Sequence, residues 1–230
     1  MKASPTSFDL GRVLSGWWWL LDRDGFRIMR FAAFWVLTTF ALYSLDHMLG
    51  LNQGLGFFST TMLLDPFFIG VLYLVALNDH GGGPIQVMGE ASRRYPALLI
   101  LTILANIGII AGFVMLILPG IALSILWAVA LPVMLTENKG PTDALRSSFD
   151  YVRPHFWPVL GAYMIYLLGL VVLIIFQIMV GLSSDDGAPG PLLAFESLTD
   201  VITSLIGIYL TTAIYRELAY TGRHDVDVFN

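Results

Sequence analysis

The chain has 230 residues, of which 57% are hydrophobic and only 13% are charged, with a mean hydropathy of +0.75 and a formal net charge of −5. A soluble domain carries about 25% charged residues, so this composition cannot cover a soluble surface and indicates an integral membrane protein. The chain contains no cysteine, which excludes disulfides, thiolate metal sites and cysteine nucleophiles. Charged residues precede the first apolar stretch without a signal-peptide pattern, so we expect that stretch to be a retained span.

Residues 8–21 are predicted to form an amphipathic helix that lies along the membrane interface. Their apolar side chains recur at helical spacing, while Asp9 and Arg12 fall on the other side. A helix packed on the protein itself is the alternative, because amphipathic character alone does not separate the two cases. The first membrane span is predicted over 28–49 and the second over 57–77.

The longest apolar run, residues 96–136, holds no charged residue. As one helix it would be about 60 Å long, twice the roughly 30 Å of a bilayer core, so it fits two spans. Pro119 lacks a backbone donor and Gly120 tolerates a turn, so the chain is expected to fold back there. The two helices of this hairpin are then predicted over 96–118 and 120–136.

Two short polar segments, 86–95 and 141–153, are predicted to be helices on the cytoplasmic membrane surface. In the second, apolar residues line one face, and Arg146 lies on the opposite face among acids that are spaced for ion pairs. The fifth and sixth spans are predicted over 156–181 and within 192–215.

The cations give an orientation. With six spans, all twelve Lys and Arg residues fall on the same side as both termini, and the loops near 50–56, 119–120 and 182–191 hold none. The positive-inside rule assigns the cation-bearing side to the cytoplasm. We therefore predict an all-α, multi-pass protein of the inner (plasma) membrane, with six spans in three hairpins and both termini cytoplasmic.

The same pattern suggests an internal repeat. Each predicted hairpin follows a short surface segment, which divides the single domain, residues 1–230, into units 8–77, 83–136 and 140–219. The sequence similarity between these units is weak. Any amphipathic helix that precedes a membrane span would show the same features.

One stretch is similar to a known membrane family. It contains Leu118-Pro119-Gly120, Pro132, Glu137, Ala144-Leu145, Ser148 and Arg153, followed by a new apolar run. This order resembles the YciC-like bacterial inner-membrane proteins and the membrane domain attached to some glycerophosphoryl diester phosphodiesterases. The resemblance implies a six-span inner-membrane protein with a link to envelope lipid homeostasis. Because the membrane unit uses the whole chain, we expect no phosphodiesterase activity.

Asp65 is the one acid deep inside a predicted span, and Pro66 follows it. A charge at that depth costs about 2.5–3.5 kcal/mol on insertion scales, which favours a functional protonatable group or an ion ligand. The competing interpretation is a protonated, structural carboxyl bonded to a backbone carbonyl that Pro66 frees, such as that of Met62. Both stay open. Pro66 and Pro132 are also expected to kink their spans.

Glu137 is expected at the end of the fourth span, either solvated or paired with a cytoplasmic arginine. The arginines that could reach it are Arg93, Arg94 and Arg146. Such a pair would hold a surface helix in place.

Glu196 and Asp200 share one face of the last predicted helix and could bind a divalent cation. Two carboxylates fall short of the usual six oxygen ligands, so a solvated pair is the commoner outcome. On the fifth span, Gly161 and Gly169 are expected to permit close helix packing.

The sequence favours a non-enzymatic membrane protein without cofactor or metal, because it lacks metal-binding His spacings, a P-loop and a nucleophile elbow. Its expected role is in lipid homeostasis or as a partner module. Expected partners are membrane lipids and a membrane protein or second copy, and not nucleic acid. The alternative is a transporter of lipids or small solutes that uses Asp65 as a protonatable group.

Overall fold

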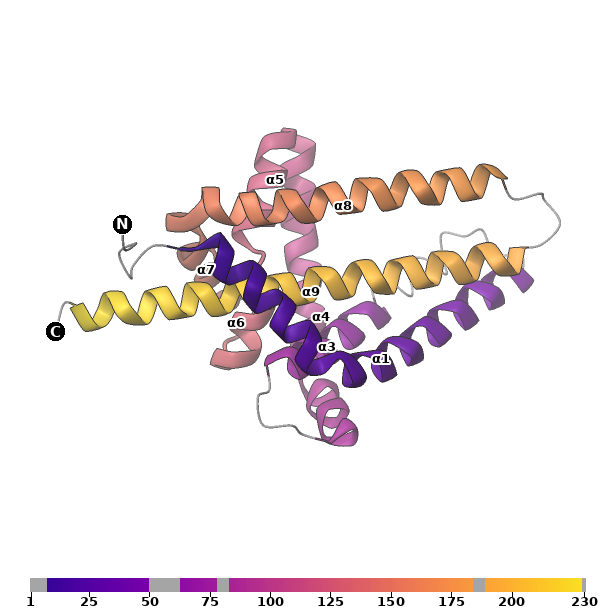
Figure 1. The fold of residues 1–230 in the computed structure, drawn as a ribbon, viewed down its shortest axis with the longest axis horizontal. Coiled ribbons are helices and arrows are strands. Elements are labelled where there is room, and N and C mark those ends of the chain that lie inside the picture. Colours follow the sequence, from indigo (N-terminus) through magenta and orange to yellow (C-terminus); the bar gives the residue numbers. More distant parts are fainter. Residues whose placement is uncertain (1–7, 50–62, 78–82, 184–188, 229–230) are drawn as a thin grey trace.

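The computed structural model describes residues 8–49, 63–77, 83–183 and 189–228, which form helices joined by short turns (Figure 1). In chain order the helices are α1 (Leu10–Met48), α3 (Asp65–Leu77), α4 (Pro84–Met115), α5 (Ile117–Leu126), α6 (Ala130–Glu137), α7 (Pro141–Val152), α8 (Phe156–Ser183) and α9 (Pro189–Val228), with a 3-10 turn, Arg153–His155, before α8. The predicted all-α class is confirmed.

The helices form one packed unit around α9. α1 packs along α9, α3 contacts α1, α4 and α9, and α8 lies beside α9. Figure 1 shows α8 and α9 along the long axis of the molecule, with the α4–α5 hairpin lying across their direction. The start of α1 and the end of α9 lie at the same end of the molecule (Figure 1).

Length and composition identify membrane-crossing candidates. Within the described residues, five helical stretches are long and apolar enough to cross a membrane: Arg27–Leu45, Ile85–Met115, Ile117–Glu137, Pro141–Phe176 and Ser197–Tyr220. The apolar helix α3 has 13 residues and is shorter than these. The beginning of the predicted second span, residues 57–62, lies outside the described residues. The chain is therefore a multi-pass membrane protein.

The predicted interfacial helix and first span are one continuous helix, α1, whose two halves run in different directions (Figure 1). No proline interrupts residues 10–48, so the charged residues between the two predicted segments remain helical. Val13 and Leu20 are buried, and α1 packs on α9. The apolar side of the first half therefore contacts the protein, which is the alternative considered from the sequence.

The predicted surface segment 86–95 is likewise not separate, because α4 continues from Pro84 through Pro96 to Met115. Pro84 occupies the first turn, where a backbone N–H would have no partner within the helix, so its absence costs no helical hydrogen bond. Pro96 lies inside the helix, a position that membrane helices tolerate better than soluble ones.

The α4–α5 hairpin turns at Leu116, three residues before the predicted position. Leu116 is extended (φ −164°, ψ 147°), and its N–H donates to the Gly112 carbonyl at 3.0 Å. Pro119 and Gly120 lie in the first turns of α5, where Pro119 needs no donor. A Cβ added to Gly120 would lie 2.5 Å from the Phe113 ring, so this glycine permits close helix contact and does not make the turn.

The helix predicted over 120–136 is divided into α5 and α6 by the turn at 127–129. Pro132 is the third residue of α6. It cannot donate to the Ala128 carbonyl, and its ring would collide with that carbonyl in a continuous helix. The break between α5 and α6 therefore lies one helical turn before Pro132 and not at the proline itself.

The amphipathic helix predicted over 141–153 is confirmed as α7, with Pro141 at its first position. Ala144 and Ser148 are buried while Arg146 is exposed, as the spacing predicted. The buried face packs on α4 and α6, and the Ser148 hydroxyl donates to the Leu126 carbonyl at 2.8 Å. Its apolar face is therefore directed at the protein and not at lipid.

Candidate functional site

A buried carboxylate joins the first and last helices. Glu217 of α9 is 7% exposed, and Arg12 of α1 donates from Nε to Oε1 and to Oε2 at 3.0 Å each. The backbone N–H of Asp9 adds a bond to Oε1 at 3.1 Å. The hydrogen bond to Glu217 raises the pKa of Arg12 above its ordinary value. Sequence patterns could not reveal this contact, because its partners are 205 residues apart.

Two arginines hold the C-terminal end of α3. Arg23 of α1 and Arg216 of α9 both donate to the Ala76 carbonyl, at 3.0 and 3.1 Å. Carbonyls in the last turn of a helix lack helical partners and favour cations. Arg23 also pairs with the buried Asp24 at 2.6 Å, and both arginines lie over the Trp19 ring. This cluster fixes α1, α3 and α9 to one another.

Glu137 ends α6 and pairs with Lys139, whose Nζ lies 2.7 Å from Oε2. The hydroxyls of Tyr151 and Tyr215 donate to Oε1 at 3.1 and 3.3 Å. The turn is made by Asn138, which has a left-handed φ of 51° and brings Lys139 back to the carboxylate. Hydrogen bonding to Glu137 raises the pKa of Lys139.

The arginines predicted to pair with Glu137 are placed differently. Arg93 donates to the Gly89 carbonyl at 3.3 Å, and Arg94 pairs with Glu90 at 2.9 Å. Arg146 is exposed and forms no ion pair within the part of the chain that the structure describes. Of the two alternatives left open for Glu137, the structure shows an ion pair, but with Lys139, which the local turn brings to the carboxylate.

Asp65 begins α3, and its carboxylate lies near the indole of the buried Trp35 of α1. Asp200 of α9 is near enough to interact electrostatically with Asp65, and the Tyr43 hydroxyl lies 3.5 Å from Asp200. The structure thus brings together two acids that were considered separately. Pro66 is the second residue of α3, directly after a π-helical stretch at residues 63–64.

Two predictions about these acids fall on residues that are not described. The cation site needs the side chain of Glu196, and the bond from Asp65 needs the carbonyl of Met62, and both lie outside the described residues. In the described part of the chain, no group of three or more acids and histidines is arranged to hold a metal ion.

We expect Asp65→Asn to preserve stability, because an amide of the same shape keeps a hydrogen-bonding group beside the Trp35 indole. Asp65→Leu removes this polar group and should cost about 0.6–2 kcal/mol, the range for hydrogen bonds inside membranes. Unfolding of the two variants in detergent measures the difference. Equal losses for Asn and Leu would contradict a structural role.

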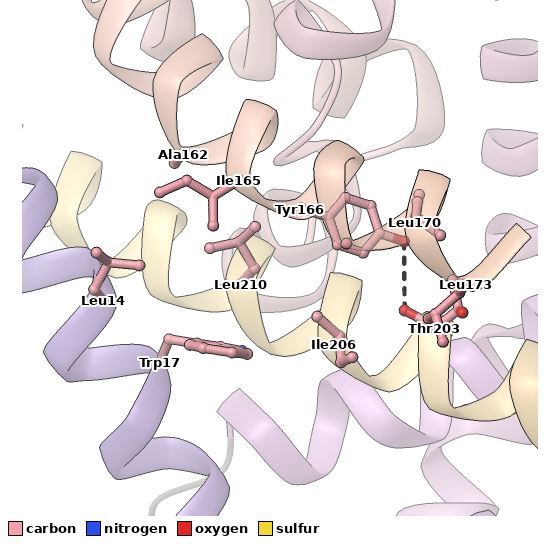
Figure 2. A pocket seen from close by; sticks show the side chains of 11 residues that line it. Leu14, Trp17, Ala162, Ile165, Tyr166, Leu170, Leu173, Thr203, Ile206 and Leu210 are labelled. Atoms are coloured by element: carbon pink, nitrogen blue, oxygen red, sulfur yellow. Dashed lines mark hydrogen bonds between the residues drawn. The ribbon is translucent and has the colours of Figure 1, made fainter. Parts of the chain in front are cut away.

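An apolar pocket of about 330 Å³ lies between α1, α8 and α9 (Figure 2). Its walls are Leu14 and Trp17 of α1, Ala162, Ile165, Tyr166, Gly169, Leu170 and Leu173 of α8, and Thr203, Ile206 and Leu210 of α9. The Tyr166 hydroxyl donates a long bond of 3.4 Å to the Thr203 carbonyl.

Gly169 helps to form this pocket. A Cβ added there, or at Gly161, would meet no neighbouring atom within 4 Å. The close packing predicted at the two glycines is therefore wrong, and at Gly169 the missing side chain leaves the pocket open. The Trp17 indole nitrogen is buried at the pocket wall without a hydrogen-bond partner.

The long apolar helices and the lateral apolar pocket define a multi-pass α-helical membrane protein. The chain belongs to the uncharacterised protein family UPF0259, whose family model matches residues 56–215. The match includes the α8 and α9 walls of the pocket and excludes the α1 wall. No solved structure matches the chain.

Proposed function

We propose that the protein binds a lipid acyl chain in the pocket between α1, α8 and α9, and serves lipid homeostasis of the inner membrane without catalysing a reaction. The pocket carries the proposal. Its volume of about 330 Å³ is within the usual range for ligand sites, and its lining is almost wholly apolar. The resemblance to YciC-like proteins agrees with this role.

The pocket can select an occupant by shape. An acyl chain already in a bilayer gains no hydrophobic free energy by entering a protein, so its binding depends on packing and polar contacts. From Ala162 to Leu173 the wall extends for about 16 Å along α8, which suits an elongated chain. An empty pocket forfeits the dispersion contacts that such a chain would supply.

Gly169→Phe should fill the pocket and remove the phospholipid that copurifies with the detergent-extracted protein, as measured by mass spectrometry. Gly161→Phe is the matched control, because it adds the same side chain to open space on the same helix outside the pocket. Equal lipid content in wild type and Gly169→Phe would contradict the proposal.

We also propose that six segments cross the membrane and that both termini are cytoplasmic. This is supported by the one-sided distribution of the twelve Lys and Arg residues, and by the two ends of the described chain lying toward the same end of the molecule (Figure 1). Reporter fusions after residues 53, 119, 187 and 230 should then read out, out, out and in. A cytoplasmic signal at 187 would refute the orientation.

The alternative function is proton-coupled transport of a lipid or small solute. It is favoured by the electrostatic interaction between Asp65 and Asp200 and by polar contacts farther along α9, such as the 3.1 Å bond between the hydroxyls of Tyr163 and Thr211. Uptake into proteoliposomes under a proton gradient tests it. Loss of uptake in Asp65→Asn, with normal folding, would favour transport over the structural role of Asp65.

A further inference from the structure

We infer that the indole N–H of Trp17 binds the ester carbonyl of a glycerolipid whose acyl chain occupies the pocket. The inference rests on the proposed function and names the chemical class of the ligand. It starts from an unsatisfied donor, since the Trp17 nitrogen is buried without a partner. Buried polar groups in proteins are nearly always hydrogen-bonded, so an exception at a pocket wall points to a group that arrives with the ligand.

The position of Trp17 matches the ester level of a membrane lipid. Leu210, at the same end of the pocket, is about 9 Å along α9 from Arg216 of the arginine cluster. On α8, Ala162 lies about 8 Å beyond Trp157, a ring that is 76% exposed at the start of that helix. Exposed tryptophans and arginines mark the headgroup region, so this end of the pocket lies just beneath it.

The other end of the pocket lies deeper. Leu173 and Thr203 line it, far along α8 and α9 from the arginine cluster. A lipid that places its ester at Trp17 therefore directs its acyl chain toward Leu173. Figure 2 shows the Trp17 ring extending from α1 toward Ile206 and Leu210.

The chemistry selects a carbonyl. The indole nitrogen donates and cannot accept, while an ester carbonyl accepts and cannot donate. An ether-linked lipid of the same chain length lacks that carbonyl, and a hydrocarbon chain offers no acceptor. Because the nitrogen lies beneath the pocket wall, the carbonyl reaches it when a wall side chain rotates, a movement on the picosecond-to-nanosecond scale.

The test compares diacyl phosphatidylglycerol with its ether-linked dialkyl analogue, titrated against the full chain by native mass spectrometry. Wild type should bind the ester lipid about threefold to tenfold more tightly, the effect of one net hydrogen bond. Trp17→Phe should bind both lipids equally. Trp18→Phe, at a ring that is 70% exposed, should keep the wild-type preference.

The outcomes separate the two proposals. Equal affinity of wild type for both lipids, or a preference that survives in Trp17→Phe, overturns the role of Trp17. Unchanged binding of both lipids in Gly169→Phe instead overturns the pocket as the lipid site. If Trp17→Phe does not fold, the ester-to-ether ratio of the wild type still decides, because the inference requires that preference.

Discussion

Replacing Gly112 with alanine is expected to destabilise the protein by about 1–3 kcal/mol, the usual cost of overpacking a close contact. A Cβ at this position would lie 2.9 Å from the Cα of Gly120 and 3.0 Å from its nitrogen. These are backbone atoms of the facing helix, and they cannot rotate away as a side chain can. The variant must therefore push α5 away from α4. Gly112→Val should cost more than alanine. Unfolding in mixed detergent measures both.

Two other glycines serve as controls. Gly161→Ala meets nothing within 4 Å and should be neutral or slightly stabilising, because alanine is the better helix former. In Gly108→Ala the added Cβ would lie 2.4 Å from the Trp127 ring, whose far edge can move. The loss of stability should therefore be smaller than that at Gly112. If all three alanine variants unfold alike, close backbone contact does not hold the hairpin together.

The helical class and several helix bounds could be predicted because they depend on local patterns. α8 begins at Phe156 as predicted and ends at Ser183, two residues beyond the predicted end at 181. The long apolar run sets this length, and Pro154 just before it sets its start. The faces of α7 followed from spacing for the same reason: Ala144 and Ser148 are buried, and Arg146 is exposed.

The errors come from contacts that sequence spacing does not encode. Pro119 and Gly120 suggested a turn, but the proline suits the start of α5 and the glycine lies against Phe113. Pro132 acts on a carbonyl one turn earlier, so the interruption falls at residues 127–129.

The candidate site likewise combines parts that local sequence predicts with contacts that it does not. Its α8 wall lies in a predicted span, but the pocket depends on how α1 crosses α9, which no local pattern specifies. Trp17 was assigned to an amphipathic helix, yet its unpaired nitrogen could be recognised only after α8 and α9 were in place. Asp65 was recognised from its depth, whereas its neighbours Trp35 and Asp200 come from other helices.

Removing Arg12 is expected to destabilise the protein more than removing Glu217, although both changes break the same ion pair. Glu217→Ala leaves Arg12, whose side chain is 43% exposed and can be hydrated, so the loss should be about 1.5–3 kcal/mol for bonds to a charged group. Arg12→Ala instead removes the guanidinium from the carboxylate of Glu217, which is only 7% exposed. Weakening the compensation of a buried charge costs more than removing an exposed one.

The double variant Arg12→Ala/Glu217→Ala isolates this effect. It removes the buried carboxylate together with the guanidinium, so it should be more stable than the sum of the single losses predicts, with a coupling within about 0.5–3 kcal/mol. Arg146→Ala is the control, because that exposed arginine forms no ion pair among the described residues, and its effect should stay within about 0.5 kcal/mol. Strict additivity of the two single losses would show that the contact between α1 and α9 does not depend on this pair.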